Sequence, residues 1–197
     1  MLIRTLVLAI TLLSIPALAT SALAEPADDD YGRPGFFAGA AMAVGIFTQI
    51  DDVYQSFTEN KIKVDTEVGV NVRVGYRLMP LLGVEAQYEW LPGPDVTETD
   101  VGEVLDSSTM MVSANAKLYL IRKELFQPYV LGGVGYLCWD PGADSRIRGF
   151  AARMGAGVDI YATRNIAVAV DVHYILPTGD VEDLDYVSVG VGVQYLF

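Results

Sequence analysis

The chain has 197 residues, of which 52% are hydrophobic and 19% are charged, and its formal net charge is −12. The acidic excess disfavours nucleic acid as a partner, because binding to phosphates requires clustered Lys and Arg. Beyond the N-terminal segment, no stretch holds the roughly 18 consecutive apolar residues that a membrane-spanning helix needs, which excludes helical membrane proteins. Half of the chain is nevertheless apolar, and in a bilayer only a closed β-barrel would satisfy the backbone of such a chain.

The N-terminal segment has the pattern of a secretory signal peptide. It carries one positive charge at Arg4, then an apolar run, and then an Ala-Leu-Ala sequence at residues 22–24 that fits a cleavage site. We therefore expect residues 1–24 to be removed on export. The acidic residues 25–35 are expected to form a periplasmic tether in front of a barrel domain at residues 36–197.

Eight segments after the tether alternate apolar residues with small or polar ones, so each would have one apolar and one polar face as a β-strand. In the last segment, Val187 and Val189 share one face, and Ser188 and Gly190 share the other. Each segment is close to the roughly 9–11 residues that a tilted membrane strand requires. The glycines of segment 128–139 blur its alternation, and its faces stay unassigned. The predicted strands cover residues 36–47, 67–77, 82–90, 109–120, 128–139, 150–161, 166–175 and 186–197.

The connections between these segments alternate in length. Short periplasmic turns and long extracellular loops are typical of outer-membrane barrels. The predicted fold class is therefore all-β, an eight-stranded antiparallel up-and-down transmembrane β-barrel with short periplasmic turns and four longer extracellular loops. The short links lie near residues 79–81, 123–125 and 163–165, and the long ones at 48–66, 91–108, 140–149 and 176–185.

Aromatic residues help to distinguish a membrane barrel from a soluble eight-stranded barrel, whose apolar face would lie inside. They fall at both ends of the predicted strands, as expected for two aromatic girdles at lipid–water interfaces. The predicted periplasmic girdle comprises Phe36, Tyr76, Tyr119, Tyr129, Tyr161, Tyr195 and Phe197. The predicted outer girdle comprises Phe47, Trp90, Trp139, Phe150, Tyr174 and Tyr186.

The C-terminal pattern Gly192-x-x-Tyr195-x-Phe197 resembles the signal that the outer-membrane assembly machinery of Gram-negative bacteria reads. With segments 128–136 and 183–190, it makes the chain similar to the small eight-stranded outer-membrane barrels, namely the OmpA transmembrane domain, OmpX and opacity-type surface antigens. The resemblance implies residence in the Gram-negative outer membrane, contact with its lipid and lipopolysaccharide, and biogenesis through periplasmic chaperones and the assembly machinery. Because the chain stops after the eighth strand, we do not expect the peptidoglycan-binding domain of full-length OmpA.

Charged residues of both signs fall on the predicted inward faces. The lumen of an eight-stranded barrel is just wide enough for side chains, and buried charges must pair there because an isolated one is costly. We expect Lys117 to pair with Glu85 and Glu89 on the neighbouring strand. The predicted luminal network comprises Arg73, Glu85, Glu89, Lys117, Arg153, Asp159 and Asp171.

Two functions are compatible with such a lumen. A network that plugs the barrel predicts a structural or surface-interaction protein, whose loops contact an unidentified surface ligand. A network whose pairs rearrange would instead gate a narrow, porin-like channel for ions or small solutes. The inward glycines Gly155, Gly157, Gly190 and Gly192 leave room for water and keep the channel as the alternative.

Other candidate sites are weaker. His173 shares a predicted face with Asp171, as in part of a hydrolase site. Barrel enzymes that deacylate lipid A have a His-x-Ser arrangement, and Ile175 stands where that serine would be, so we predict no enzyme and no catalytic residue. Carboxylates cluster at residues 95–106 and 180–185, where Ca²⁺ bridging to lipopolysaccharide is an alternative to simple solvation. No cofactor or metal site is predicted.

The single cysteine and two arginines of a predicted loop are further candidate features. Cys138 is the single cysteine, so an intramolecular disulfide is impossible, and we expect a buried, small apolar role for it. Arg146 and Arg148 fall in the predicted third loop, where they are candidates for contact with lipid phosphates.

Overall fold

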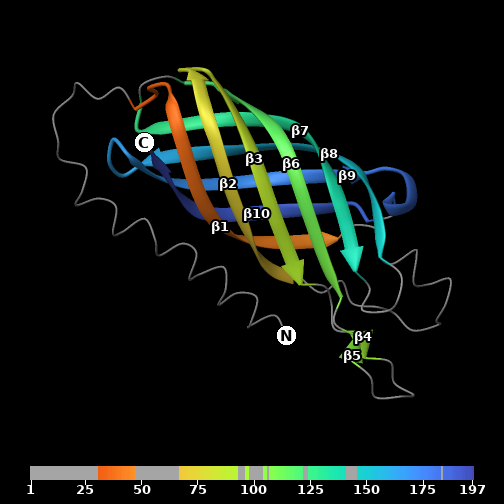
Figure 1. Cartoon of the computed structure of the whole chain (residues 1–197). Coiled ribbons are helices and arrows are strands. Elements are labelled where there is room, and N and C mark those ends of the chain that lie inside the picture. Colours follow the sequence, from red (N-terminus) through yellow and green to blue (C-terminus); the bar gives the residue numbers. More distant parts are fainter. Residues whose placement is uncertain are drawn as a thin grey trace.

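The structure is a computed structural model that describes residues 31–47, 67–92, 96–97, 104–105, 107–121, 124–140, 146–182 and 184–197. Eight long strands close into one barrel (Figure 1), which confirms the predicted fold class. Every predicted strand boundary lies within three residues of the observed one. The strands are β1 (Gly35–Phe47), β2 (Glu67–Met79), β3 (Leu82–Pro92), β6 (Ser108–Tyr119), β7 (Phe126–Asp140), β8 (Ile147–Tyr161), β9 (Ile166–Pro177) and β10 (Tyr186–Leu196).

The barrel closes because its first and last strands pair. Strands β1 and β10 run antiparallel in register from Phe37 opposite Leu196 to Phe47 opposite Tyr186. Each remaining strand of the barrel pairs antiparallel with its neighbours along the chain. None of the eight strands in the described residues has an open edge, so hydrogen bonds between neighbouring strands satisfy their backbone N–H and C=O groups without water.

Short turns join β2 to β3, β6 to β7 and β8 to β9 at the end of the barrel where the C-terminus lies, and longer connections leave the other end (Figure 1). We call the first the turn end and the second the loop end. In outer-membrane barrels the end with short turns faces the periplasm and the end with long loops faces the exterior, and we expect the same orientation here. Among the described residues, no helix is long and apolar enough to cross a membrane.

Two short elements occupy the loop end. A two-stranded ribbon of β4 (Val96–Thr97) and β5 (Val104–Leu105) lies between β3 and β6, which the strand pattern did not predict. A 3₁₀ helix, η1 (Gly179–Val181), lies between β9 and β10 and begins at Gly179, whose φ of 76° suits a residue without a side chain. Its Val181 is buried against the barrel.

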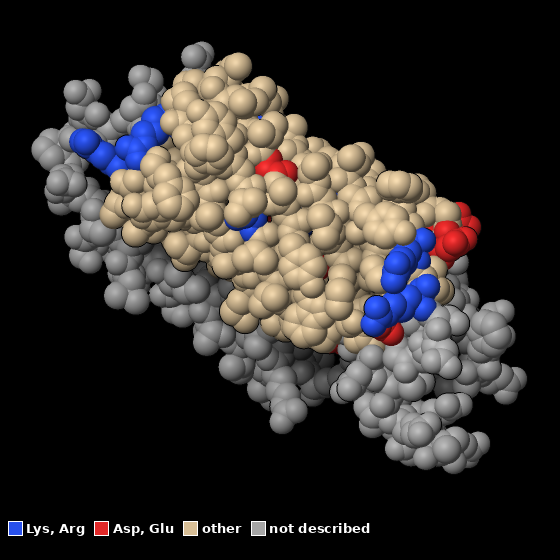
Figure 2. Space-filling model, in the orientation of Figure 1, with Lys and Arg blue, Asp and Glu red and all other residues tan. Residues whose placement is uncertain are grey.

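The strand faces invert the usual arrangement of a water-soluble protein. On β2, Val70, Val72 and Val74 point outward and are about half exposed, whereas Asn71 and Arg73 between them are buried. Valine favours strands because its branched side chain packs well on a pleated surface. Figure 2 shows few charged atoms on the middle of the barrel wall, with Lys and Arg at both ends and most of the visible Asp and Glu at the loop end. Such a wall is compatible with the hydrocarbon core of a membrane.

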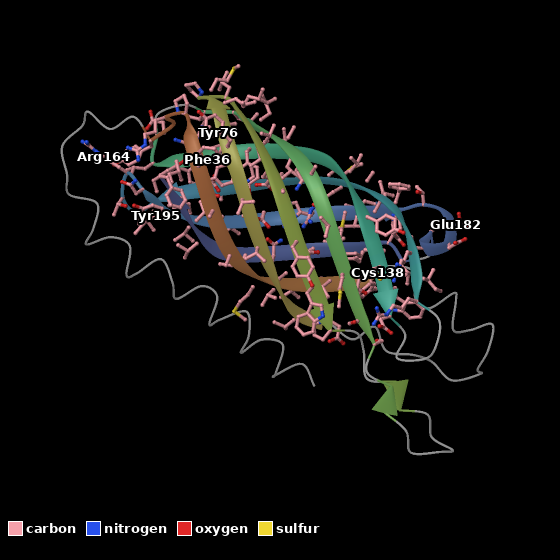
Figure 3. The ribbon with its side chains drawn as sticks, viewed as in Figure 1. Phe36, Tyr76, Cys138, Arg164, Glu182 and Tyr195 are labelled. Carbon is pink, nitrogen blue, oxygen red and sulfur yellow. The ribbon has the colours of Figure 1, made fainter. Side chains whose placement is uncertain are left out.

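The structure also assigns the faces of β7, which its glycines had obscured. Tyr129, Leu131 and Leu137 are buried inside the barrel, and Val130 and Val134 point outward. Cys138 is half-buried on the outward face, so the expectation of a buried residue is wrong. Figure 3 shows it at the loop end.

The predicted girdles are only partly correct. At the turn end, Phe36, Tyr76 and Tyr195 do lie on the outward face (Figure 3), and the rings of Phe36 and Tyr76 pack edge to face at 4.7 Å. Nearness to a strand end does not fix the face of a residue, because the face follows the parity of its position. By parity, six of the predicted girdle residues occupy inward positions. Five of them are buried, namely Phe47, Tyr119, Tyr129, Tyr161 and Tyr186, and Trp139 is half-buried opposite the buried Thr109.

The predicted signal peptide at 1–24 and tether residues 25–30 lie outside the described residues, and the domain boundaries stay predictions. The described part begins at Tyr31, whose ring lies 5.4 Å from that of Tyr161. Tyr31 packs there against the buried residues Phe37, Tyr161, Ala167 and Leu196. An apolar cluster therefore fills the lumen at its turn end.

Candidate functional site

The lumen is the candidate functional site, because it holds most of the ionisable residues of the membrane-spanning strands. The structure places all seven predicted luminal charges on inward faces, each at most 4% exposed. Strand alternation puts them there, since each occupies a polar position between outward apolar neighbours. They come from β2, β3, β6, β8 and β9, so the network joins strands that are distant along the chain.

Three ion pairs form inside the lumen, and Glu89 takes part in one of them. Lys117 Nζ lies 3.0 Å from Glu85 Oε2, as expected from the sequence. Arg73 lies 2.8 Å from Asp171, and this contact joins β2 to β9. Buried pairs of this kind gain little net free energy, but removing one partner leaves a costly unpaired charge.

Glu89 was expected beside Lys117, and this expectation is wrong. Its Oε2 instead lies 2.7 Å from Arg153 Nη2 of β8. Glu89 also accepts hydrogen bonds from Tyr186 (2.9 Å), Ser188 (3.2 Å) and Asn71 (3.1 Å). Residues of three other strands, β2, β8 and β10, therefore bind this one carboxylate of β3, and they satisfy most of its lone pairs inside the barrel.

Asp159 has polar rather than cationic partners. It accepts hydrogen bonds from Tyr119 (3.1 Å) and from Gln194 (3.0 Å). The sequence-based network missed Arg77, which is buried just inside the turn end. Its guanidinium lies 3.7 Å from the centre of the Tyr119 ring and donates to the Tyr161 hydroxyl (3.1 Å). Its place on β2, four residues after Arg73, was the signal that could have revealed it.

The buried strand residues are formally balanced in charge. The described strands bury four basic side chains and four carboxylates on the lumen side, so their formal charges sum to zero. This balance favours a self-contained network over a binding site for a permanently bound ion. The eight residues are Arg73, Arg77, Lys117 and Arg153 with Glu85, Glu89, Asp159 and Asp171.

His173 does not have the geometry of a hydrolase triad. Its Nδ1 lies 3.0 Å from Arg153 Nη2 and 3.4 Å from Asp171 Oδ1. An arginine can only donate, so Nδ1 accepts from Arg153, whereas in a triad that nitrogen donates to the aspartate. Ser188 lies opposite His173 on β10, but its hydroxyl bonds to Glu89. This region therefore fits luminal packing.

An apolar cluster closes the loop end of the lumen. It is built from inward residues of β1, β3, β6, β7, β8, β9 and β10 together with Val181 of η1. The ring of Tyr186 packs at 5.1 Å from that of Phe47, and its hydroxyl reaches down to Glu89. We call this cluster the outer cap, and it comprises Ala43, Phe47, Leu91, Met111, Leu137, Ala151, Ile175, Val181 and Tyr186.

The space directly beside the Cα atoms of the inward glycines is occupied by neighbouring groups, while the expectation that the lumen holds water stays a prediction. A methyl group on Gly155 would lie 2.4 Å from His173, and one on Gly190 would lie 2.4 Å from Asp171 Oδ1. At Gly157 it would lie 2.6 Å from the Tyr129 hydroxyl, and at Gly192 2.5 Å from Ala41. The glycines let large neighbouring groups fill the lumen.

The remaining predicted residues lie away from the lumen centre. Tyr195 and Phe197 are exposed on the outer wall at the turn end, with ring centres 5.0 Å apart, and Gly192 lies on the inward face. Their role as an assembly signal stays a prediction. All five acidic residues at 95–106 lie outside the described residues. Among the described residues, no group of His, Cys, Asp and Glu is arranged to hold a metal.

A closed eight-stranded barrel with an apolar wall, charges in its interior and at its two ends, and short turns at one end defines an integral β-barrel protein of the Gram-negative outer membrane. Residues 5–197 match the family model of the outer membrane protein beta-barrel domain, and the chain belongs to this family.

Named relatives agree with this class. Outer membrane protein A of Klebsiella aerogenes is 24% identical over 191 residues, which cover 93% of this chain and 53% of that protein, so the chain spans about half of its length. The crystal structure of Neisserial surface protein A superposes with a TM-score of 0.65 at 15% identity, covering 83% of this chain and 97% of that one. Ail, the attachment invasion locus protein of Yersinia pestis, superposes with a TM-score of 0.56 at 15% identity, covering 84% and 99%, in a complex with the heparin analogue sucrose octasulfate.

Proposed function

We propose that this protein is a closed outer-membrane barrel that serves as a scaffold for surface interaction through its extracellular loops. The observation that carries the proposal is the continuous filling of the lumen. The outer cap closes the loop end, three ion pairs cross the middle, and the cluster around Tyr161 closes the turn end. An eight-stranded barrel filled by side chains leaves little space for solute.

The comparisons are consistent with a surface role. Neisserial surface protein A and the attachment invasion locus protein are named for the cell surface and for attachment, and this chain has their fold. The proposed partners are outer-membrane lipid, lipopolysaccharide and an unidentified surface ligand, with the assembly machinery and periplasmic chaperones acting during biogenesis. No catalytic activity is part of this proposal.

A narrow gated channel is the second candidate, and one observation favours it. Several buried nitrogen atoms have no hydrogen-bond partner within the described residues, among them Arg73 Nη2, Arg153 Nε and His173 Nε2. Unused donors can bind water or a new carboxylate partner when the network rearranges. A rearranged, hydrated network is what a gate would require.

Planar-bilayer recording separates the two functions. Protein purified from outer membranes should insert and remain silent, because the outer cap blocks the lumen. The double variant Leu91→Ala and Met111→Ala removes two large fully buried side chains of the cap and should also remain silent, because the ion pairs and the turn-end cluster still fill the lumen. Heat-modified gel mobility of the reconstituted protein verifies that it is folded in the membrane. Reproducible current steps from the unchanged protein would contradict the scaffold and support the channel.

A further inference from the structure

Charge on the lipid-facing wall is confined to one place. Outward-facing positions of the described strands carry only one basic residue, Arg148 of β8, and one acidic residue, Asp140 of β7. Both lie at the loop end, on the two longest strands of the barrel. The hydrocarbon-facing part of the described wall carries no basic residue, and a cation at the edge of such a wall is placed to meet the anionic headgroups that lie just beyond the hydrocarbon.

The length of β8 sets the depth of Arg148. A strand tilted as in membrane barrels advances about 2.5 Å per residue along the membrane normal. Tyr161 ends β8 at the turn end, so Phe150 lies about 28 Å and Arg148 about 33 Å from that boundary. The apolar band of such a barrel is about 25 Å tall. Phe150 therefore lies near the outer edge of the band, and Arg148 lies beyond it, among the headgroups of the outer leaflet.

Two contacts support this position. Phe150 is 72% exposed and packs edge to face on Tyr136 at 5.5 Å, so an aromatic pair marks the interface directly below Arg148. Above it, the neighbouring Arg146 is bound to Asp140 at 2.8 Å. Among the described residues, no carboxylate lies within ion-pair distance of Arg148. Asp140 thus compensates Arg146, and Arg148 is left available for another anion.

Resting on lipopolysaccharide as a partner in the proposed function, we propose that Arg148 binds a phosphate group of lipid A, the phosphorylated lipid anchor of lipopolysaccharide, on the β7–β8 face of the barrel. A guanidinium matches the oxygens of a phosphate in a two-pronged hydrogen bond. The acyl chains of the same lipid lie against the exposed rings of Phe150 and Tyr136. Figure 2 shows blue side chains at the loop end, where the tan wall ends.

The test uses the protein purified in a zwitterionic detergent and native mass spectrometry of the lipid that it retains. Diphosphoryl lipid A and phosphatidylglycerol are added together at equal concentration, and dephosphorylated lipid A is added in a separate sample. The protein should retain diphosphoryl lipid A preferentially. Arg148→Gln should reduce that retention about tenfold, the usual scale for one charge-assisted hydrogen bond, and Arg148→Lys should reduce it less.

Arg164→Gln is the matched control, because Arg164 is also exposed but lies at the turn end (Figure 3). It should leave retention unchanged. Heat-modified gel mobility verifies that each variant is folded. Equal retention by Arg148→Gln and by the unchanged protein would overturn the proposal. So would equal retention of dephosphorylated lipid A, which would indicate acyl-chain contact alone, or of phosphatidylglycerol, which would indicate an unselective anion site.

Discussion

At the scale of single residues, the lumen combines ion pairs with aromatic rings. Lys117 is fully buried, pairs with Glu85, and has its Nζ 4.3 Å from the centre of the Tyr129 ring. Such a group is held by several partners, and its loss would leave the facing carboxylate in a medium that solvates charge poorly. The stability of the barrel should therefore depend on keeping each pair complete.

Lys117→Ala tests this dependence. The variant leaves Glu85 as an uncompensated buried charge, so the free energy of unfolding should fall by about 3–5 kcal/mol. Urea titration of the protein in lipid vesicles, followed by tryptophan fluorescence, measures the change.

The double variant Lys117→Met with Glu85→Gln serves as its control. It removes both charges while keeping similar volumes, and it should recover most of the lost stability. A single variant as stable as the unchanged protein would show that this pair does not hold the lumen together.

At the scale of strands, glycines decide how closely luminal groups approach the wall. Gly157 of β8 and Gly132 of β7 lie on adjacent strands but on opposite faces. A methyl group on Gly157 would meet the Tyr129 ring and hydroxyl at 2.6 Å and the carbonyl oxygen of Val170 at 2.7 Å. On Gly132 it would meet nothing within 4 Å.

Substituting alanine at each glycine should therefore give unequal results. Gly157→Ala should lower the free energy of unfolding by about 1–3 kcal/mol, as is typical of overpacking. Gly132→Ala should change it by less than about 0.5 kcal/mol. Parallel urea titrations compare the two variants, and equal losses would mean that the space inside the barrel does not limit these positions.

At the scale of the whole molecule, most of the fold could be predicted from the sequence. Alternation over about ten residues determines both the strand and its faces, which is why β2, β3 and β9 were assigned correctly. It failed on β7, where Gly132, Gly133 and Gly135 carry no side chain to mark a face. Too many aromatic residues were assigned to the girdles, because the assignment followed their position near a strand end and not the face on which alternation places them.

The partners inside the lumen could be predicted only in part. Lys117 and Glu85 lie on neighbouring strands, so their contact follows from adjacency. The contact of Glu89 with Arg153 joins β3 to β8, and it depends on the closure and stagger of the barrel, which no local pattern encodes. Ligands of the loops depend on residues whose chemistry follows no strand periodicity.

Water access to the lumen tests the closed barrel most directly. In a Cys138→Ala background, Ser113→Cys places a thiol at a buried inward site on β6, and Thr178→Cys places one at an exposed site of the loop end. The folded protein is treated with a charged, membrane-impermeant thiol reagent. The filled lumen predicts rapid labelling at position 178 and none at position 113 until the protein is unfolded. Rapid labelling of folded Ser113→Cys would show an open, water-filled lumen and contradict the closed barrel.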